Sequence, residues 1–144
     1  NYYKGVIYMG DCACNSGVKL IYSCSGNADV GEISDRVARA LRREGFGQGS
    51  CIAAVGAGMQ GFIQSAKGAD VNIAIDGCPV ACARKILESI GVTPESYIVT
   101  EMGFKKGHTH VTPEVIETVF NTVKQGKSDK AETKYAPVTG GGCG

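Results

Sequence analysis

Four short apolar segments recur along the chain. They cover residues 18–22, 51–55, 69–75 and 97–100, and the segment at 69–75 is rich in β-branched residues. Segments of this length, bounded by glycine and small polar residues, are typical of buried β-strands. The pattern therefore predicts four strands, each covered on both faces of a sheet.

Helical periodicity follows these segments. Apolar residues recur at helical spacing with charged residues on the opposite side, which predicts amphipathic helices packed on a sheet. The predicted helices are marked by Val30, Ile33, Val37 and Leu41, by a short piece at 59–67, by Val80, Ala83, Leu87 and Ile90, and by Ile116, Val119, Phe120 and Val123. Thr112 and Pro113 suit the capping position and the first position of the last helix.

The alternation of strand and helix, with short connections, is typical of a parallel sheet with helices on both faces. We therefore predict a single-domain α/β fold, a three-layer, flavodoxin-like (Rossmann-like) parallel sheet in the strand order 2-1-3-4. Ligand sites in such sheets form at the carboxyl ends of the strands, where the strand order reverses. In this chain that point lies between the first and the third strand.

The predicted metal-binding α/β domain spans residues 18–125 of the 144-residue chain. A cysteine-containing segment at 1–17 precedes it. A polar and then glycine-rich tail at 126–144 follows it, and we expect this tail to be flexible. One domain is the expectation for a chain of this length.

Charge and composition narrow the class of protein. The chain has 15 Lys and Arg against 14 Asp and Glu, a formal net charge of +1, so composition offers no basis for nucleic-acid or membrane binding. No apolar run reaches the roughly 18 residues of a membrane helix, and the first residues lack a signal-peptide pattern, so we expect a cytoplasmic protein. Seven cysteines in a reducing compartment favour metal or thiol chemistry over disulfides.

The Asp-Gly-Cys-Pro stretch at 76–79 follows the third predicted strand. Gly77 permits a sharp turn, and Pro79 suits the first position of the next helix. Cys78 and Cys82 would then lie about one helical turn apart, facing the same way. The positive end of the helix favours thiolate over thiol at this place.

Three cysteines are expected to meet at this edge of the sheet. Cys24 ends the first predicted strand, and Cys78 and Cys82 follow the third. Because thiolates are typical zinc ligands, we predict that these three residues bind a zinc ion. The alternative interpretation of each is a buried, apolar cysteine.

Several stretches resemble the DGC-domain family, which is named for its central Asp-Gly-Cys. They are Tyr22-Ser23-Cys24-Ser25-Gly26, Asp29-Val30-Gly31, the segment that begins at Cys51, Ile75-Asp76-Gly77-Cys78-Pro79, and Cys82-Ala83-Arg84-Lys85. The resemblance covers residues 12–123. It implies a zinc-binding protein in which Cys24, Cys51, Cys78 and Cys82 chelate the metal.

The predicted strands argue against one of these four cysteines. Cys51 opens the second predicted strand and so is expected near the amino edge of the sheet. Because a strand rises about 3.3 Å per residue, Cys51 would lie more than about 10 Å from the other thiols, and a packed thiol is the preferred interpretation. Cys12 and Cys14 are then candidates for the missing ligands, since Cys-x-Cys can chelate a metal, with a mobile thiol pair as the alternative. Cys143, on the tail, is interpreted as incidental.

Polar residues near this edge have more than one interpretation. Asp76 can cap the following helix, orient a ligand or act as a base. His108 and His110 lie with two lysines after the fourth predicted strand, where they form a solvated loop or contribute to an anion or metal site. The loop at 25–27 precedes the first helix and is a weak candidate for holding a small anion.

The thiols support two functional hypotheses. The first is a zinc-binding protein, with a metal ion and a small anionic ligand as its partners. The second is thiol redox or sulfur-transfer chemistry, with Cys78 as nucleophile and Cys82 or Cys24 resolving; a sulfur-ligated iron cluster is a third option. Cys78 and Arg84 also have the spacing of thiol phosphatases, but Pro79 removes an N–H that an oxyanion loop needs.

Overall fold

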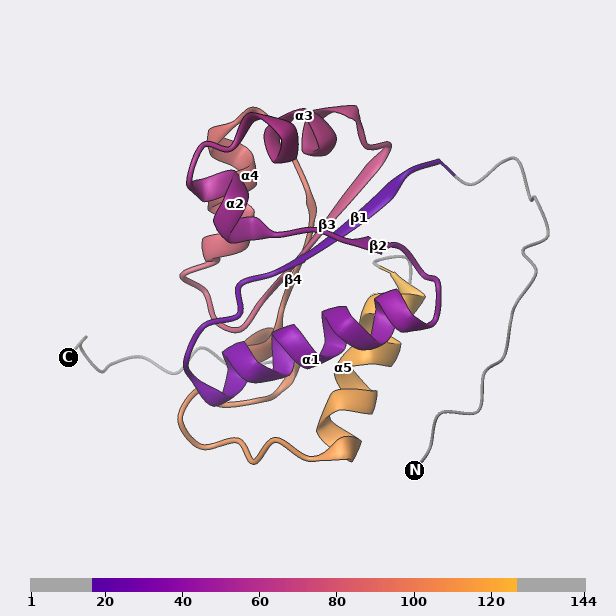
Figure 1. Cartoon of the computed structure of the whole chain (residues 1–144). Coiled ribbons are helices and arrows are strands. Elements are labelled where there is room, and N and C mark those ends of the chain that lie inside the picture. The colour runs from indigo at the N-terminus through magenta and orange to yellow at the C-terminus, as the bar shows by residue number, and fades with distance from the viewer. Residues whose placement is uncertain (1–16, 127–144) are drawn as a thin grey trace, which may run out of the picture.

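A sheet of four parallel strands forms the centre of the protein (Figure 1). The computed structural model of the chain describes residues 17–126. The strands within them are β1 (Lys19–Ser23), β2 (Gln48–Gly49), β3 (Val71–Asp76) and β4 (Glu95–Ile98). The order β2-β1-β3-β4, with every pairing parallel, confirms the predicted topology.

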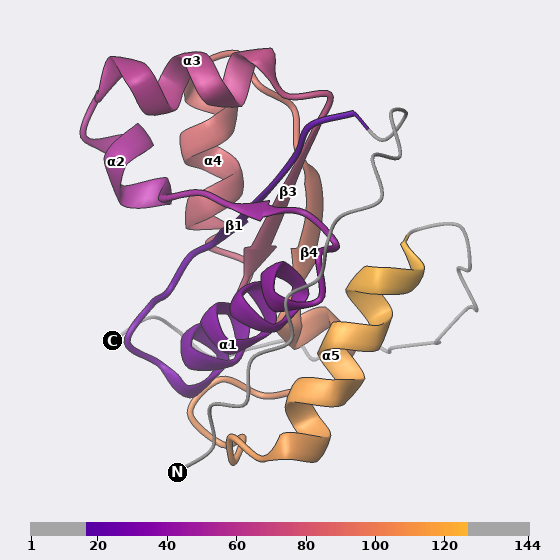
Figure 2. The same ribbon diagram turned by 45° about the vertical axis from the view of Figure 1, so that its right-hand side comes forward.

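Helices cover both faces of this sheet (Figures 1 and 2). One face carries α1 (Asp29–Arg43) and α5 (Pro113–Gln125). The other carries α2 (Ile52–Gly56), α3 (Gln60–Gly68) and α4 (Cys82–Ser89). A 3-10 helix, η1 (Val99–Met102), follows β4. These three layers confirm the predicted flavodoxin-like α/β architecture.

The core consists of two apolar clusters, one on each face of the sheet. On β1, Ile21 belongs to the cluster under α1 and α5, whereas Leu20 and Tyr22 belong to the cluster under α2, α3 and α4. On β3, Ile75 and Ala74 divide in the same way. Successive side chains of a strand point to opposite faces, so a strand covered on both sides is apolar throughout.

Two helices begin and pack as the sequence predicts. The core face of α1, from Val30 to Leu41, is fully buried. The Thr112 hydroxyl accepts a hydrogen bond from the Val115 N–H at 3.4 Å, and Pro113 is the first residue of α5. This capping satisfies one of the backbone donors that every helix start leaves unpaired.

The second strand does not lie where the sequence predicts it. Residues 51–55 are predicted as a strand, but they contribute to α2, and β2 ends before them. A short apolar run fits a strand or a helix equally well by periodicity. Here only one side of the run is covered, since Ala54 and Val55 are buried and Ala53 is exposed, and a helix suits that arrangement.

This shift moves Cys51 to the other edge of the sheet. Ser50 follows β2, and its N–H donates to the Ile21 carbonyl oxygen of β1 at 2.9 Å, directly before Cys51. Cys51 therefore follows the carboxyl end of β2 and is the capping residue of α2. Its predicted position at the amino edge is wrong.

Two other boundaries differ from the prediction. The helix after β3 begins at Cys82 and not at Pro79, because Ala81 has a left-handed backbone (φ 52°) that interrupts the helix. Val80 is consequently 53% exposed and does not pack in the core. The fourth strand is predicted at 97–100, whereas β4 begins two residues earlier and the chain then turns into η1.

The predicted segments at both ends lie outside the described residues, apart from Gly17 and Gly126. Among the helices that the structure describes, none is long and apolar enough to cross a membrane.

Candidate functional site

The carboxyl ends of β1 and β3 lie side by side and bring Cys24 to the Asp-Gly-Cys turn at 76–78. The Cys24 N–H donates to the Ile75 carbonyl oxygen at 3.0 Å. The Gly77 N–H in turn donates to the Cys24 sulfur at 3.3 Å. Cys24 and this turn therefore meet at the point where the strand order reverses, as the predicted topology requires.

Gly77 is needed for a close approach of two backbone segments. A Cβ atom at this position would lie 2.8 Å from the Gly31 nitrogen and from the Val30 carbonyl carbon and oxygen. The turn after β3 thus packs directly on the first turn of α1. The sequence-based reason for this glycine, a turn that needs its conformational freedom, is wrong, since Gly77 is not among the described residues with positive φ.

Ser34 is a buried polar residue that sequence reasoning missed. It lies on the otherwise apolar face of α1 and is fully buried. Its hydroxyl donates to the Gly31 carbonyl oxygen at 2.7 Å and lies 3.4 Å from the Cys24 sulfur. The sequence does contain a signal for this residue, since Ser34 interrupts the apolar face of a predicted helix. A buried hydroxyl requires a hydrogen-bond partner, so such a serine indicates a polar contact in the core.

Cys24 and Cys51 line the same cavity, which has a volume of about 750 Å3. Cys24 is partly buried against the α2–α4 side of the core, and Cys51 is exposed at the start of α2. The cavity is also lined by hydroxyl and basic side chains, among them Ser23, Ser25, Ser50, Arg39 and Arg42. The structure thus brings together two thiols that the sequence-based argument separates.

Cys78 and Cys82 do not lie on one helical face as predicted. Cys82 is the exposed first residue of α4, whereas Cys78 precedes the helix and packs against the α1–α5 side of the core. The Lys106 Nζ lies 3.9 Å from the Cys78 sulfur. Residues 78–81 are not helical, so Cys78 lies outside the helix that begins at Cys82.

Asp29 holds the loop that carries Lys106. Its carboxylate accepts hydrogen bonds from the Gly107 N–H and the Thr109 N–H, each at 2.8 Å. Both belong to a loop far away in the sequence, so Asp29 anchors that loop to the start of α1. Sequence reasoning missed this role, although Asp29 lies within one of the stretches that resemble the family.

The same hydrogen bonds change the acidity of Asp29. Desolvation alone would raise the pKa of this carboxyl. The backbone hydrogen bonds from Gly107, Thr109 and Val30, together with the nearby His108, outweigh desolvation and lower the pKa below its ordinary value. Asp29 is therefore a firmly ionised anchor at neutral pH.

The two predicted histidines lie in this anchored loop. His108 and His110 are both exposed, and with Lys106 and Asp29 they line a cavity of about 580 Å3. Ser25, of the other predicted anion loop, donates to the Asp35 carboxylate at 3.0 Å and lies 2.8 Å from the Ser23 hydroxyl. Its hydroxyl is thus already engaged within the protein.

Asp76 caps α4 from the end of β3. The carboxylate is 1% exposed and accepts from the Ala83 N–H at 2.8 Å and from the Arg84 N–H at 3.1 Å. The capping interpretation of Asp76 is therefore confirmed. The Arg84 side chain lies along the helix, with its Nε atom 3.7 Å from a Glu88 oxygen, an arrangement that provides no phosphatase-like pairing with Cys78.

Comparison with known proteins shows the family of this chain. The profile of the DGC domain matches residues 20–123. The chain belongs to the DGC domain family. A curated relative, the anaerobic and virulence modulator AnvM of Pseudomonas aeruginosa, is 33% identical over 88 residues, which cover 60% of this chain and 67% of AnvM. No solved structure matches the chain.

The described part of this DGC domain has free thiols but no assembled metal site. Cys24, Cys51, Cys78 and Cys82 are all unpaired. Within residues 17–126, no three Cys, His, Asp or Glu side chains are grouped so that they could hold a metal ion. The other two predicted ligands, Cys12 and Cys14, lie outside the described residues, as does Cys143, which is interpreted as incidental.

Proposed function

We propose that this DGC domain binds a zinc ion through thiolates at the carboxyl edge of its sheet, on the side covered by α2 and α4. One observation carries the proposal: Cys24 follows β1, Cys51 follows β2 and Cys82 begins α4, so all three leave the same edge. Cys24 and Cys51 share a cavity, and α2 packs against α4. Thiolates are the ligands that zinc prefers among these side chains.

The chemistry of these donors fits zinc, but their arrangement is incomplete. Because the described side chains do not group in threes, binding requires the three thiols to turn toward one another. A fourth ligand is also needed. Cys12 or Cys14 is the proposed donor, and a water or small anionic ligand is the alternative, as in zinc sites with an open position. A bound zinc ion would act there as a Lewis acid.

Cys78 supports a second candidate function, thiol redox or sulfur-transfer chemistry. It packs on the α1–α5 side of the core, whereas Cys24 packs on the other side, and the Cys78 sulfur has Lys106 as a cationic neighbour at 3.9 Å. Reactive cysteines typically lie in such electropositive, partly exposed places. Cys78 would form a mixed disulfide with an oxidised substrate, and the thiol of Cys82 or Cys24 would then attack this disulfide and release the reduced substrate.

Elemental analysis of protein purified without oxygen tests the proposed zinc site. We expect about one zinc per chain, as in a single tetrahedral thiolate site. Cys24→Ser, Cys51→Ser and Cys82→Ser should each lower the zinc content, because each removes a proposed ligand. Cys78→Ser is the matched control and should retain the metal.

Each other outcome has a definite meaning. Protein without metal would refute zinc binding, and iron in place of zinc would indicate a sulfur-ligated cluster. If Cys78→Ser alone empties the site, the division of the thiols between the two sides of the sheet is wrong. Metal-free protein in which mild oxidation links Cys78 to Cys82 or Cys24 would favour the second candidate function.

A further inference from the structure

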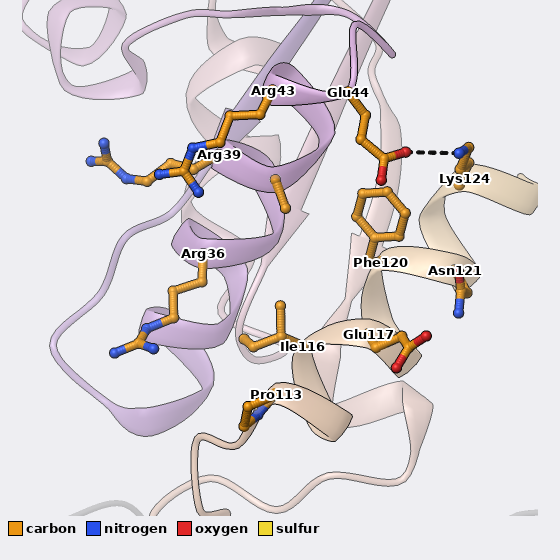
Figure 3. Close-up of a pocket in the computed structure, with 11 residues that line it drawn as sticks. Arg36, Arg39, Arg43, Glu44, Pro113, Ile116, Glu117, Phe120, Asn121 and Lys124 are labelled. Atoms are coloured by element: carbon orange, nitrogen blue, oxygen red, sulfur yellow. Dashed lines mark hydrogen bonds and ion pairs between the residues drawn. The ribbon is translucent and has the colours of Figure 1, made fainter. Parts of the chain in front are cut away.

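A groove of about 750 Å3 runs between α1 and α5, on the opposite side of the sheet from the proposed zinc ligands. Figure 3 shows Ile116 and Phe120 of α5 between the two helices. Both are partly buried and extend the apolar core to the surface. The centre of the groove is therefore apolar and accessible.

Three arginines form the α1 side of this groove. Arg36, Arg39 and Arg43 extend from α1 on the side away from α5 (Figure 3). Arg36 and Arg39 pair within the helix with Glu32 and Asp35, at 2.6 Å and 2.7 Å. Among residues 17–126, no carboxylate forms an ion pair with Arg43. This side of the groove thus offers positive charge, most openly at Arg43.

The α5 side of the groove has mixed charge. Glu117 is exposed there, and Lys124 closes one end of the groove through an ion pair with Glu44 at 2.9 Å. The Lys124 ammonium also lies 5.4 Å from the centre of the Phe120 ring. A negatively charged ligand would be repelled by Glu117 and attracted to the arginines, so its orientation across the groove is defined.

We propose that this groove binds an acidic, amphipathic helix of a protein partner. Its apolar side chains would contact Ile116 and Phe120, and its carboxylates would lie along the arginines. Positions 36, 39 and 43 follow one flank of α1 at intervals of roughly one helical turn, which matches carboxylates three or four residues apart on a partner helix. Helices bind apolar grooves through such spaced contacts.

The apolar centre favours a peptide over a nucleic acid. A phosphate backbone would use the arginines but would gain nothing from Ile116 and Phe120, and Glu117 would repel it. The proposal does not rest on the zinc site, because none of the proposed ligands lines the groove, although Arg39 lines both the groove and the cavity of Cys24 and Cys51.

Binding of a labelled synthetic peptide, measured by fluorescence anisotropy, tests the proposal. The probe is about 15 residues long, with leucines along one face and glutamates along one flank. We expect saturable binding that weakens with added salt, and we expect Arg43→Glu to weaken it about fivefold or more. Arg42→Glu is the matched control, since it makes the same charge change on the same helix but faces the cavity of Cys24 and Cys51.

The control should change the affinity by less than about twofold. An equal loss of affinity in both variants would mean that only the net charge of the protein matters. That result would rule out the groove as the binding site. Absence of saturable binding, equal binding of a peptide with lysines in place of glutamates, or stronger binding of a single-stranded oligonucleotide would also overturn the proposal. Circular dichroism of the two variants shows whether both retain the fold.

Discussion

Contacts with single residues in the first two turns of α1 hold three distant segments against this helix. Asp29 anchors the loop that carries Lys106, Ser34 contacts the Cys24 sulfur, and Gly77 lies directly against Val30. None of these contacts is between neighbours in the sequence. They explain physically why polar and small residues occur beside the apolar positions of this helix.

Replacing Asp29 with asparagine should destabilise the protein at neutral pH by about 1 kcal/mol, because a charged acceptor of several N–H bonds is lost. The folded-state pKa of Asp29 is lowered, so its stabilisation is complete above the ordinary aspartate pKa of about 3.9. It is lost as the pH falls through the lower folded-state value. Urea unfolding of both proteins between neutral and acidic pH should show this difference shrinking in acid.

Glu32→Gln is the control for this prediction. Glu32 is exposed on the same helix and forms an ion pair with Arg36, four residues on, so its loss should cost less than about 0.5 kcal/mol. An Asp29→Asn variant as stable as the wild type at neutral pH would contradict the anchoring role.

At the level of elements, the start of α4 depends on a carboxylate from the preceding strand. Asp76 satisfies two backbone donors of the first turn of α4 while Ala81 has a left-handed backbone. The helix therefore begins at Cys82. Cys78 precedes the helix and packs on the side of the sheet that α1 and α5 cover. Capping from a strand end thus separates the two thiols of the motif.

Replacing Asp76 with alanine should lower the free energy of unfolding by roughly 2–4 kcal/mol, because two N–H groups, one of them buried, would lose their partner. Asp76→Asn retains one acceptor oxygen and should have a smaller effect. Ser89→Ala, at the exposed far end of α4, is the control and should change stability by less than about 0.5 kcal/mol. Equal effects of the Asp76 and Ser89 substitutions in urea unfolding would refute the capping role.

At the scale of the whole molecule, helices cover both faces of the sheet. A ligand site is therefore expected at the carboxyl edge of the sheet. Both faces are filled by apolar clusters, and the loops and helix starts that follow β1, β2 and β3 carry the thiols. A ligand held there by several segments would stabilise the folded state, because the unfolded chain cannot present those thiols together.

Removing the proposed zinc ion should therefore lower the melting temperature. A ligand at a hundredfold excess over its dissociation constant stabilises a folded protein by about 2.7 kcal/mol, which corresponds to a shift of several degrees in a domain of this size. Thermal melting with and without a chelator measures this shift. The Cys82→Ser variant should melt at the same temperature in both conditions, and an unchanged melting temperature of zinc-containing wild-type protein would contradict the linkage.

The predictions that failed share one physical cause. The run at 51–55 and the motif at 76–79 are short, and local pattern does not distinguish their possible conformations. Their structure was decided by contacts with other elements: β1 pairs with the residues before Cys51, and Asp76 reaches across the turn to cap α4. The longer periodic segments, α1 and α5, were predicted well because a whole helix face must be buried.

The sequence by itself determined the parallel α/β fold, the strand order and the meeting of Cys24 with the Asp-Gly-Cys turn. Strands and helices that alternate along a chain with short connections can form few topologies, and parallel strands place their carboxyl ends at one edge of the sheet. Only the tertiary structure decided which thiols lie on which side of that edge. It placed Cys51 in the cavity that Cys24 lines and turned Cys78 toward Lys106, because the direction of a side chain in a short loop depends on the elements packed around it.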